Sequence, residues 1–312
     1  MTLSKAFREA TLQHRGRLCR NEPLAKHCSW RTGGHAEYFF EPIDLDDLIS
    51  VLGQFPSCRI TWLGLGSNVL IRDGGLDGLV VSTKKMNKIS WLDNGLMRAD
   101  CGVACAKIAK ESASRGYGGA EFLAGIPGTI GGALTMNAGA FDGETWDLVV
   151  RAQVLDRSGV IQNVEPGDYV TGYRQVGLPN EQWFVSAELA FSNIEASEEN
   201  HSEKGQERIK ALLAQRAATQ PTGVASCGSV FKNPANDFAG RLIEEAGLKG
   251  FQLGACAVSD KHANFIVNEA RASASEIEAL IKHVQSRVLE QHGIFLEPEV
   301  RIIGNELAEA GR

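Results

Sequence analysis

Two glycine-rich stretches contain the residue types that could hold a large anionic ligand. The first covers residues 64–68 (Gly-Leu-Gly-Ser-Asn), directly after the apolar run 60–63, and the second extends from Gly125 to Ala140. Glycine has no Cβ, so successive backbone N–H groups can turn inward and approach a diphosphate closely. Together the two stretches indicate a diphosphate-bearing ligand held from two sides. The first stretch alone could equally be a tight hairpin turn.

The first stretch is not a complete dinucleotide-binding motif. Val69 stands where the third glycine of G-x-G-x-x-G belongs, and no glycine-initiated helix clearly follows. A Rossmann unit is therefore disfavoured.

A hydroxyl, an ammonium group and an amide lie close together in residues 228–234 (Gly-Ser-Val-Phe-Lys-Asn-Pro). The stretch is not G-x-S-x-G, and no Asp/His pair is placed to activate Ser229, so a nucleophilic serine is disfavoured. Ser229 could instead donate a proton, and Lys232 could hold a phosphate or a carboxylate. The alternative is an ordinary polar turn.

Two further charged residues stand out by their surroundings. Arg174 follows Gly172 and Tyr173 in a loop between predicted strands, where a lone arginine is usually solvated. Glu299 lies between Pro298 and Val300 in an apolar segment, where a carboxylate is either paired or functional. The seven histidines show no metal-ligand spacing, so we predict no metal site.

The elements that must position these residues follow from apolar periodicity and turn residues. The pattern predicts an α+β body to about residue 195, a polar junction over 195–207, and a smaller α/β domain beyond it. Ser273 with Glu276 forms a capping box that starts a helix. The predicted helices are 3–20, 44–52, 103–115, 209–220, 238–247 and 273–288. The predicted strands are 60–63, 79–82, 148–156, 160–164, 183–191 and 297–303.

Composition restricts the class of protein. The formal charge of −6 over 312 residues argues against general nucleic-acid binding. Seven cysteines without a Cys-x-x-Cys pair fit reduced thiols, and the first residues lack the apolar core of a signal peptide, so we expect a cytoplasmic protein. The run 122–141 has the length of a membrane helix but carries five glycines and Pro127, which favours a buried ligand-binding loop.

In combination and order, these segments resemble the MurB family, UDP-N-acetylenolpyruvoylglucosamine reductase. The resemblance extends from Trp30 to the last predicted strand. The segment after Pro234 is short, with three residues before Phe238, so the chain resembles the family's shorter branch, which lacks a tyrosine-bearing loop. The matching segments are 31–34, 64–70, 125–141, 173–174, 228–234, 239–243, 247–250, 258–268 and 296–301.

The resemblance implies a fold and a domain order. It implies an N-terminal helical segment (1–29), an FAD-binding domain of the vanillyl-alcohol-oxidase (PCMH) type in two subdomains (30–195), and a smaller α/β substrate-binding domain (196–312). The final strand, 296–303, would carry Glu299.

The resemblance also implies the site. The family's catalytic residues correspond to Arg174, Ser229 and Glu299, and its substrate contacts to Tyr173, Lys232 and Asn233. The residues expected to bind FAD are Arg31, Thr32, Gly33, Gly64, Gly66, Ser67, Asn68, Gly125, Pro127, Gly128, Gly131, Gly132, Asn137 and Gly139.

The implied activity is reduction of UDP-N-acetylglucosamine enolpyruvate to UDP-N-acetylmuramate in peptidoglycan precursor synthesis. NADPH would reduce FAD, hydride would pass from FAD N5 to the enolpyruvyl methylene, and Ser229 would supply the proton. Arg174 would pair with the carboxylate, and Glu299 would act in its protonated form or orient a neighbour. We expect no nucleic-acid or membrane partner, and a monomer or a weak homo-oligomer.

Two other functions remain open from the residues. One is an FAD-dependent sugar or alcohol oxidase or dehydrogenase of the same fold, although its covalent members carry a His or Cys flavin attachment that the first glycine stretch lacks. The other is a nucleotide-sugar binding module that has lost its flavin, which the intact glycines disfavour.

Overall fold

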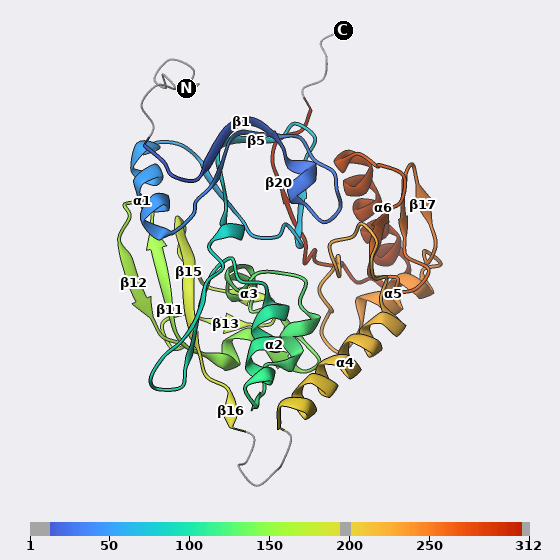
Figure 1. The fold of residues 1–312 in the computed structure, drawn as a ribbon. Helices are drawn as coiled ribbons and strands as arrows, with labels where there is room; N and C mark the ends of the chain where they lie inside the picture. The colour runs from blue at the N-terminus through green and yellow to red at the C-terminus, as the bar shows by residue number, and fades with distance from the viewer. Residues whose placement is uncertain (1–12, 194–200, 308–312) are drawn as a thin grey trace. The chain divides into compact units, whose positions relative to one another are not determined.

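The computed structural model describes residues 13–193 and 201–307 and is rich in short strands (Figure 1). The strands are β1 (Arg17–Pro23), β2 (His35–Glu41), β3 (Ile60–Leu63), β4 (Val69–Ile71), β5 (Leu76–Ser82), β6 (Ile89–Trp91), β7 (Met97–Asp100), β8 (Tyr117–Gly118), β9 (Gly139–Ala140), β10 (Gly143–Glu144), β11 (Val149–Asp156), β12 (Ile161–Val164), β13 (Thr171–Gly172), β14 (Gln175–Val176), β15 (Gln182–Leu189), β16 (Ser192–Asn193), β17 (Gln252–Leu253), β18 (Cys256–Val258), β19 (Ile266–Asn268) and β20 (Arg301–Ile303).

Most helices are short. The α-helices are α1 (Leu45–Gln54), α2 (Cys105–Ser114), α3 (Ile130–Met136), α4 (His201–Thr219), α5 (Ala239–Glu245) and α6 (Ala274–His292). The 3-10 helices are η2 (Leu24–His27), η3 (Thr83–Lys85), η4 (Glu121–Gly125) and η5 (Thr145–Leu148).

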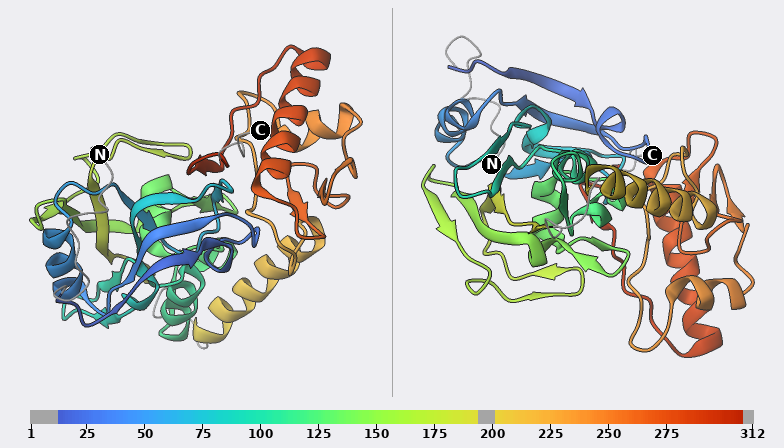
Figure 2. Two further views of the ribbon diagram at one scale, coloured as in Figure 1. Left: turned by 90° about the horizontal axis from the view of Figure 1, so that it is seen from above. Right: turned by 60° about the horizontal axis from the view of Figure 1, so that its bottom comes forward.

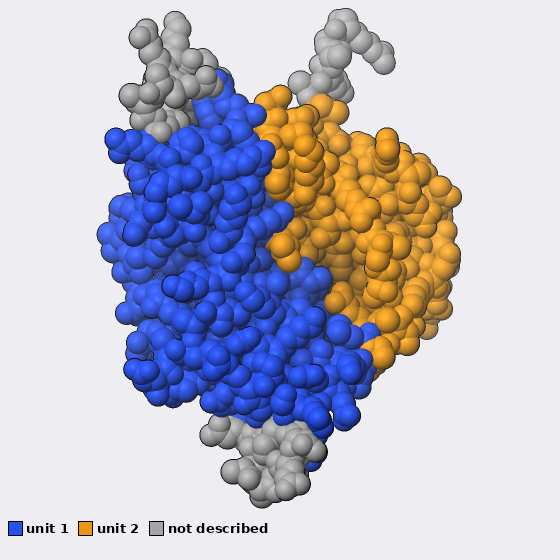
Figure 3. Space-filling model, viewed as in Figure 1, with its two compact units in different colours: residues 1–20, 38–64, 78–213 blue, residues 21–37, 65–77, 214–312 orange. Residues whose placement is uncertain are grey.

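The chain forms two compact units, each assembled from separate segments (Figure 3). Unit 1 contains residues 1–20, 38–64 and 78–213, and unit 2 contains 21–37, 65–77 and 214–312. The chain therefore passes between the units several times, within β1, β2, β5 and α4 and at the first glycine stretch. The predicted boundary near residue 195 lies inside the last segment of unit 1.

The largest sheet of unit 1 has the strand order β12-β11-β15-β7-β6. All four of its strand pairings are antiparallel, and β11 largely alternates buried and more exposed residues along its length. This alternation buries one face against α3, which packs beside β15 (Figure 1). Trp146 and Phe184 meet edge to face in this core, with ring centroids 5.8 Å apart.

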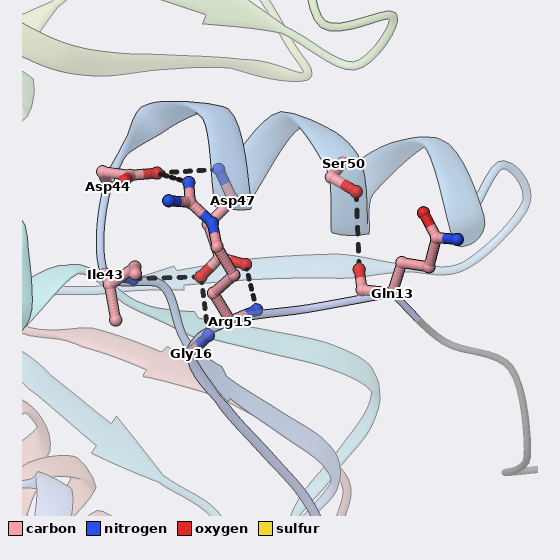
Figure 4. Close-up of polar contacts among 7 residues, drawn as sticks. All are labelled: Gln13, Arg15, Gly16, Ile43, Asp44, Asp47 and Ser50. Atoms are coloured by element: carbon pink, nitrogen blue, oxygen red, sulfur yellow. Dashed lines mark hydrogen bonds and ion pairs between the residues drawn. The ribbon is translucent and has the colours of Figure 1, made fainter.

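A second core of unit 1 forms where α1 packs near β5. Leu48, Val51 and Val81 belong to this buried cluster. The buried Asp47 carboxylate organises the start of α1, because it accepts hydrogen bonds from the backbone N–H groups of Arg15, Gly16 and Ile43 at 2.7–3.1 Å (Figure 4). Asp44 caps the helix by accepting from the Asp47 N–H at 2.9 Å.

Unit 2 combines a three-stranded sheet, β17-β18-β19, with α6, which packs against β18 (Figure 2). A parallel pair, β20 with β4, joins the C-terminal segment to residues 65–77. Two residues after β4 hold α6. Arg72 makes a bidentate ion pair with Glu278, and Asp73 accepts from the first N–H groups of the helix at 2.9 Å.

The structure confirms most predicted elements and corrects two. The Ser273–Glu276 capping box at the start of α6 is present. The predicted helix 3–20 is wrong where it is described, because residues 17–20 belong to strand β1 and the segment to residue 12 lies outside the described residues. The predicted last strand is shorter than expected. It begins at Arg301, so Glu299 lies before it.

The charge-free run 122–141 is not a single helix. It forms the end of η4, the short helix α3 and strand β9. Within the described residues, no helix is long and apolar enough to span a membrane.

Candidate active site

The first glycine stretch is a turn at which the chain leaves unit 1, with Gly64 in unit 1 and residues 65–68 in unit 2. Gly66 has a φ of +68°, and a Cβ there would collide with the carbonyl oxygen of His27. A Cβ on Gly64 would lie 2.6 Å from Thr129 Oγ1, which belongs to the second stretch. Gly64 and Thr129 are therefore neighbours in unit 1, and the two glycine stretches meet there.

The second stretch surrounds the start of α3. Thr129 caps this helix, and its hydroxyl accepts from the N–H of Gly132 at 3.4 Å. Gly131 is buried, and a Cβ there would lie 2.7 Å from the Cβ of Cys101. Gly132 is exposed, and a Cβ there would meet only Thr129 Oγ1, at 3.7 Å. Packing therefore requires glycine at 131, whereas position 132 leaves open space.

The rest of the stretch is held by neighbouring backbone and aromatic groups. A Cβ on Gly125 would lie 2.6 Å from the ring of Phe141, and the carbonyl of Gly128 accepts from the N–H of Cys105 at 3.0 Å. Pro127, between them, is exposed. The exposed part of this loop is thus residues 127 and 132, with the glycines behind them packed on the core.

Asn137 ends α3 and joins three segments. It adopts a left-handed conformation with a φ of +44° and is buried. Its Nδ2 donates to Glu144 Oε2 at 2.8 Å and to the Gly172 carbonyl at 3.3 Å, while its Oδ1 accepts from the Trp146 N–H. Both Nδ2 hydrogens are thus donated within the protein, so a cofactor contact from Asn137 would have to come from Oδ1 or from its backbone.

Tyr173 and Arg174 form the two-residue turn between β13 and β14, where Gly172 pairs with Gln175. Arg174 has a φ of +55°, which is unusual for a side chain of this size. Its guanidinium lies over the Tyr173 ring, 4.9 Å from the centroid, and donates to the Gly139 carbonyl at 2.9 Å. Unit 1 thus brings together Tyr173, Arg174, Asn137 and Gly139.

In unit 2, Ser229 begins a segment whose backbone is fixed on both sides. The next two residues, Val230 and Phe231, are 1% and 2% exposed. Asn264, itself buried, accepts from the Phe231 N–H at 3.0 Å and donates to the Phe231 carbonyl at 2.8 Å. The Asn264 carbonyl also accepts from the Val230 N–H. This clamp holds the half-buried Ser229 at a defined position.

Glu299 is anchored to the same segment. Its N–H donates to the Val230 carbonyl at 2.8 Å, and Pro298 forms an isolated antiparallel bridge with Phe231. Asn68 links Glu299 to the first glycine stretch, because Asn68 Nδ2 donates to the Glu299 carbonyl at 3.1 Å. Unit 2 thus brings together Ser229, Glu299 and Asn68.

Lys232 and Asn233 already have partners in the protein. Lys232 Nζ lies 2.6 Å from an oxygen of the exposed Glu297 carboxylate. Asn233 Oδ1 accepts from the N–H of Ala239, the first residue of α5, at 3.1 Å. A substrate phosphate at Lys232 would therefore compete with an exposed carboxylate.

Residues 31–33 pack against the strand that follows the first glycine stretch. Arg31 is exposed with a φ of +57°, whereas Thr32 is buried. A Cβ on Gly33 would lie 2.8 Å from the Ile71 carbonyl, and its φ is +125°. These three residues and Gly66, Ser67 and Asn68 all belong to unit 2.

The catalytic residues implied by the sequence are thus divided, with Arg174 in unit 1 and Ser229 and Glu299 in unit 2. Two structural residues escaped sequence reasoning. Thr129 could have been found, because a threonine before an Ile-Gly-Gly helix start is a typical N-cap. Asn264 could not, since its partner Phe231 is 33 positions away. No group of three or more possible metal ligands occurs within the described ranges.

Comparison with known proteins places these features in one family. Residues 36–165 match an FAD-binding domain, and residues 220–303 match the C-terminal domain of UDP-N-acetylenolpyruvoylglucosamine reductase. The reductase of that name from Methylococcus capsulatus is 50% identical over 99% of this chain and 100% of its own length. The one from Alkalilimnicola ehrlichii is 48% identical over 93% of this chain and 95% of its own length.

Similar solved structures support the same family and fold. The MurB reductase from Thermus caldophilus is 28% identical, with a TM-score of 0.78 over 93% of this chain and 99% of that one. An oxidase from Arthrobacter nicotinovorans, 6-hydroxy-D-nicotine oxidase, is 13% identical with a TM-score of 0.53 over 93% of this chain and 90% of that one, so it shares the fold alone. The predicted fold class is confirmed: an FAD-binding domain of the vanillyl-alcohol-oxidase type is followed by the reductase's C-terminal domain. The chain belongs to the UDP-N-acetylenolpyruvoylglucosamine reductase family.

Proposed function

We propose that this protein is an FAD-dependent oxidoreductase that uses NADPH to reduce UDP-N-acetylglucosamine enolpyruvate to UDP-N-acetylmuramate, a step of peptidoglycan precursor synthesis. The observation that carries the proposal is the 50% identity to a reductase of that name over nearly the whole chain. The anchoring of Glu299 on the Ser229 segment supports Ser229 and Glu299 as parts of one site within unit 2.

The residues present in unit 1 fit a bound flavin nucleotide. Gly132 is exposed, and a Cβ there would meet only Thr129 Oγ1, so a ligand group can approach the backbone closely at the start of α3. We propose that Gly64, Gly125, Pro127, Gly128, Gly131, Gly132 and Gly139 line this part of the FAD site. When bound, FAD supplies the hydride chemistry that the side chains of the protein cannot.

Unit 2 contains the rest of the first glycine stretch, residues 65–68. We propose that Gly66, Ser67 and Asn68 contact FAD by their backbone and small side chains, together with Arg31, Thr32 and Gly33. Asn68 would then have two roles, because its side chain also holds the backbone of Glu299.

Arg174 supplies positive charge for the substrate. Negative charge develops on the enolpyruvyl carbon next to the carboxylate, and a guanidinium can accept a carboxylate through two parallel hydrogen bonds. The exposed Tyr173 ring beside Arg174 offers a face for the substrate. Asn137 at the end of α3 connects this helix to the Arg174 turn, because its Nδ2 donates to the Gly172 carbonyl, and Glu144 accepts from the same Nδ2.

Ser229 donates the proton that completes the reduction. A hydroxyl is a weak acid, but the carbon it protonates is strongly basic, so a fixed position matters more than acidity. The backbone clamp by Asn264 provides that position and selects the face that receives the proton. Glu299, in its protonated form or by orienting a neighbour, supports this step, while Lys232 and Asn233 contact the substrate.

The proposed function also implies the protein's partners, oligomeric state and location. The protein uses NADPH and the enolpyruvyl nucleotide sugar, acts as a monomer or a weak homo-oligomer, and resides in the cytoplasm. None of its seven cysteines, all within the described residues, forms a disulfide, which fits a reducing compartment.

The decisive experiment follows the visible absorbance of the purified protein without oxygen. We expect flavin bands that bleach when NADPH is added and return when UDP-N-acetylglucosamine enolpyruvate follows. Bands that return only with air would favour the alternative sugar or alcohol oxidase. A colourless protein would contradict the FAD assignment.

A further inference from the structure

Two cysteines of unit 2 lie side by side although they are far apart in the sequence. Cys28 and Cys227 are 5% and 3% exposed. The Cys28 thiol donates to the Val69 carbonyl at 3.2 Å, and the Cys227 thiol donates to the same oxygen at 3.4 Å. A shared acceptor requires the two sulfur atoms to be close, so that each thiol changes the pKa of the other.

The two thiols have different surroundings. The hydrogen bond from Cys227 lowers the pKa of Cys28, and the backbone N–H groups of residues 30–32 add to this effect against the opposing cost of burial. Burial and the neighbouring Cys28 raise the pKa of Cys227 well above its usual range. One thiol is thus suited to react as a thiolate and the other to resolve the product.

Two other buried cysteines lack such an arrangement. Burial raises the pKa of Cys101 and of Cys105 to about 12. Their thiols belong to the core of unit 1 and are expected to be inert. Burial alone therefore does not explain why the pKa of Cys28 is lowered, since it raises the pKa of these two buried thiols.

We propose that Cys28 and Cys227 are a modification site, a dithiol that a small hydroperoxide converts reversibly into a disulfide. The Cys28 thiolate attacks one oxygen of hydrogen peroxide, the O–O bond breaks, hydroxide leaves, and a sulfenic acid forms. The Cys227 thiol then attacks that sulfur, an S–S bond forms, and water leaves. The proton that the Cys28 thiol released converts the hydroxide to water, so overall two thiols are oxidised to a disulfide and one peroxide is reduced to two waters.

The disulfide would act on the surrounding turn. Both thiols donate to the Val69 carbonyl, and Cys227 Sγ also lies 3.8 Å from the Gly66 carbonyl oxygen. Oxidation to a disulfide would remove the S–H donors from these carbonyl groups. Cys28 precedes residues 31–33, and Cys227 precedes Ser229 by two positions. If the proposed function holds, the modification therefore links a flavin-binding segment to the segment that carries the proton donor.

The test uses the full-length protein treated with a small excess of hydrogen peroxide and then mapped by non-reducing peptide mass spectrometry. We expect two of the seven thiols to disappear, a peptide pair joined through Cys28 and Cys227, and full recovery with dithiothreitol. This result concerns the thiols alone and does not depend on flavin or on the nucleotide sugar. Seven remaining thiols, or a link through other cysteines, would overturn the proposal.

Variants assign the roles of the two sulfurs. Cys227→Ser should leave Cys28 as a sulfenic acid that dimedone traps, whereas Cys28→Ser should leave Cys227 reduced. Cys256→Ser is the matched control, because Cys256 is a buried thiol of the same unit that donates to the Leu253 carbonyl. It should still lose two thiols. Equal dimedone labelling of Cys28 and Cys227 in the two single variants would contradict the assigned order.

Discussion

The turn that carries Arg174 and the segment that carries Ser229 are held by different means. Arg174 lies in a short hairpin whose residues are largely exposed, with Val170 at its edge 83% exposed, and its guanidinium donates to the Gly139 carbonyl. Ser229 precedes two fully buried residues that Asn264 clamps through backbone and side-chain groups. The fold thus fixes the position of Ser229, the proposed proton donor. Arg174, which is proposed to bind the substrate carboxylate, lies in an exposed turn that can change conformation when the ligand binds.

The largest effect is expected at the fixed position. Ser229→Ala should slow reoxidation of the reduced flavin by the enolpyruvyl substrate about 10²–10⁴-fold, because general acid catalysis contributes factors of this size. Flavin reduction by NADPH should stay unchanged. Rapid-mixing absorbance measures both half-reactions, and equal slowing of the two would remove Ser229 as proton donor.

Arg174→Ala should reduce the same half-reaction about 10²–10³-fold, since it removes charge stabilisation of the developing anion. Stability should change little because the hairpin is exposed. Arg174→Lys should recover part of the rate but not all, since an ammonium cannot make the bidentate contact. Unfolding of the Arg174→Ala variant would contradict the expectation that this exposed hairpin contributes little to stability.

Asn264→Ala should lower the free energy of unfolding by about 2–4 kcal/mol, since it leaves two buried backbone groups of Phe231 without partners. Denaturant titration measures this loss. If Asn264 also positions Ser229, substrate-driven reoxidation should slow in the folded variant while NADPH-driven reduction does not. Loss of stability with both rates intact would limit Asn264 to a structural role.

A smaller effect concerns the anchoring of α6 by Arg72. The ion pair with Arg72 lowers the pKa of Glu278 to about 2, with a further contribution from Lys282 against the cost of burial. The folded-state pKa lies below the ordinary value of 4.5, so the stabilisation is fully present above that pH and is lost as pH falls toward 2. Partial exposure of Arg72 reduces the contribution to about 1–2 kcal/mol.

We therefore expect Glu278→Gln to destabilise the protein near neutral pH and to match the wild type progressively as pH falls below about 4.5. Chemical denaturation at several pH values measures the difference. A constant difference down to acid would mean that packing, and not the ion pair, explains the loss.

The smallest effect is expected at the hairpin edge. Val170→Ser replaces an exposed apolar side chain and should change the free energy of unfolding by less than about 0.5 kcal/mol. Denaturant titration of the wild type and of the variant measures this difference. A large loss would show that the hairpin is held more firmly than the exposure of its residues suggests.

Local patterns predicted many elements but not their assembly. The Ser273–Glu276 capping box and the acidic first turn of α1 are short-range signals and are confirmed. Strand β1 was predicted as helix because its basic residues allow an amphipathic pattern, whereas pairing with β2 decides the structure. Glu299 lies outside β20, since the proline before it interrupts regular pairing at that point.

The division into units had no local signal. The polar composition of 195–207 is easy to see in the sequence, whereas the chain leaves unit 1 at residue 64 through an ordinary glycine turn and re-enters it at residue 78 inside β5. Likewise, the Asn68 contact to Glu299 spans 231 positions. The candidate site stays a prediction from residue types and from the family resemblance, whereas the contacts that position Asn68 and Glu299 are long-range.

The pairing of β4 with β20 has a consequence for synthesis of the chain. β4 leaves the ribosome long before its parallel partner, and Arg72 is made 206 positions before Glu278. At about 5–20 residues per second, this separation corresponds to about 10–40 s of translation. During that time Val69–Ile71 exposes an unpaired strand edge, the kind of surface that chaperones protect and that aggregation exploits. The last strand to be translated is the one that covers it.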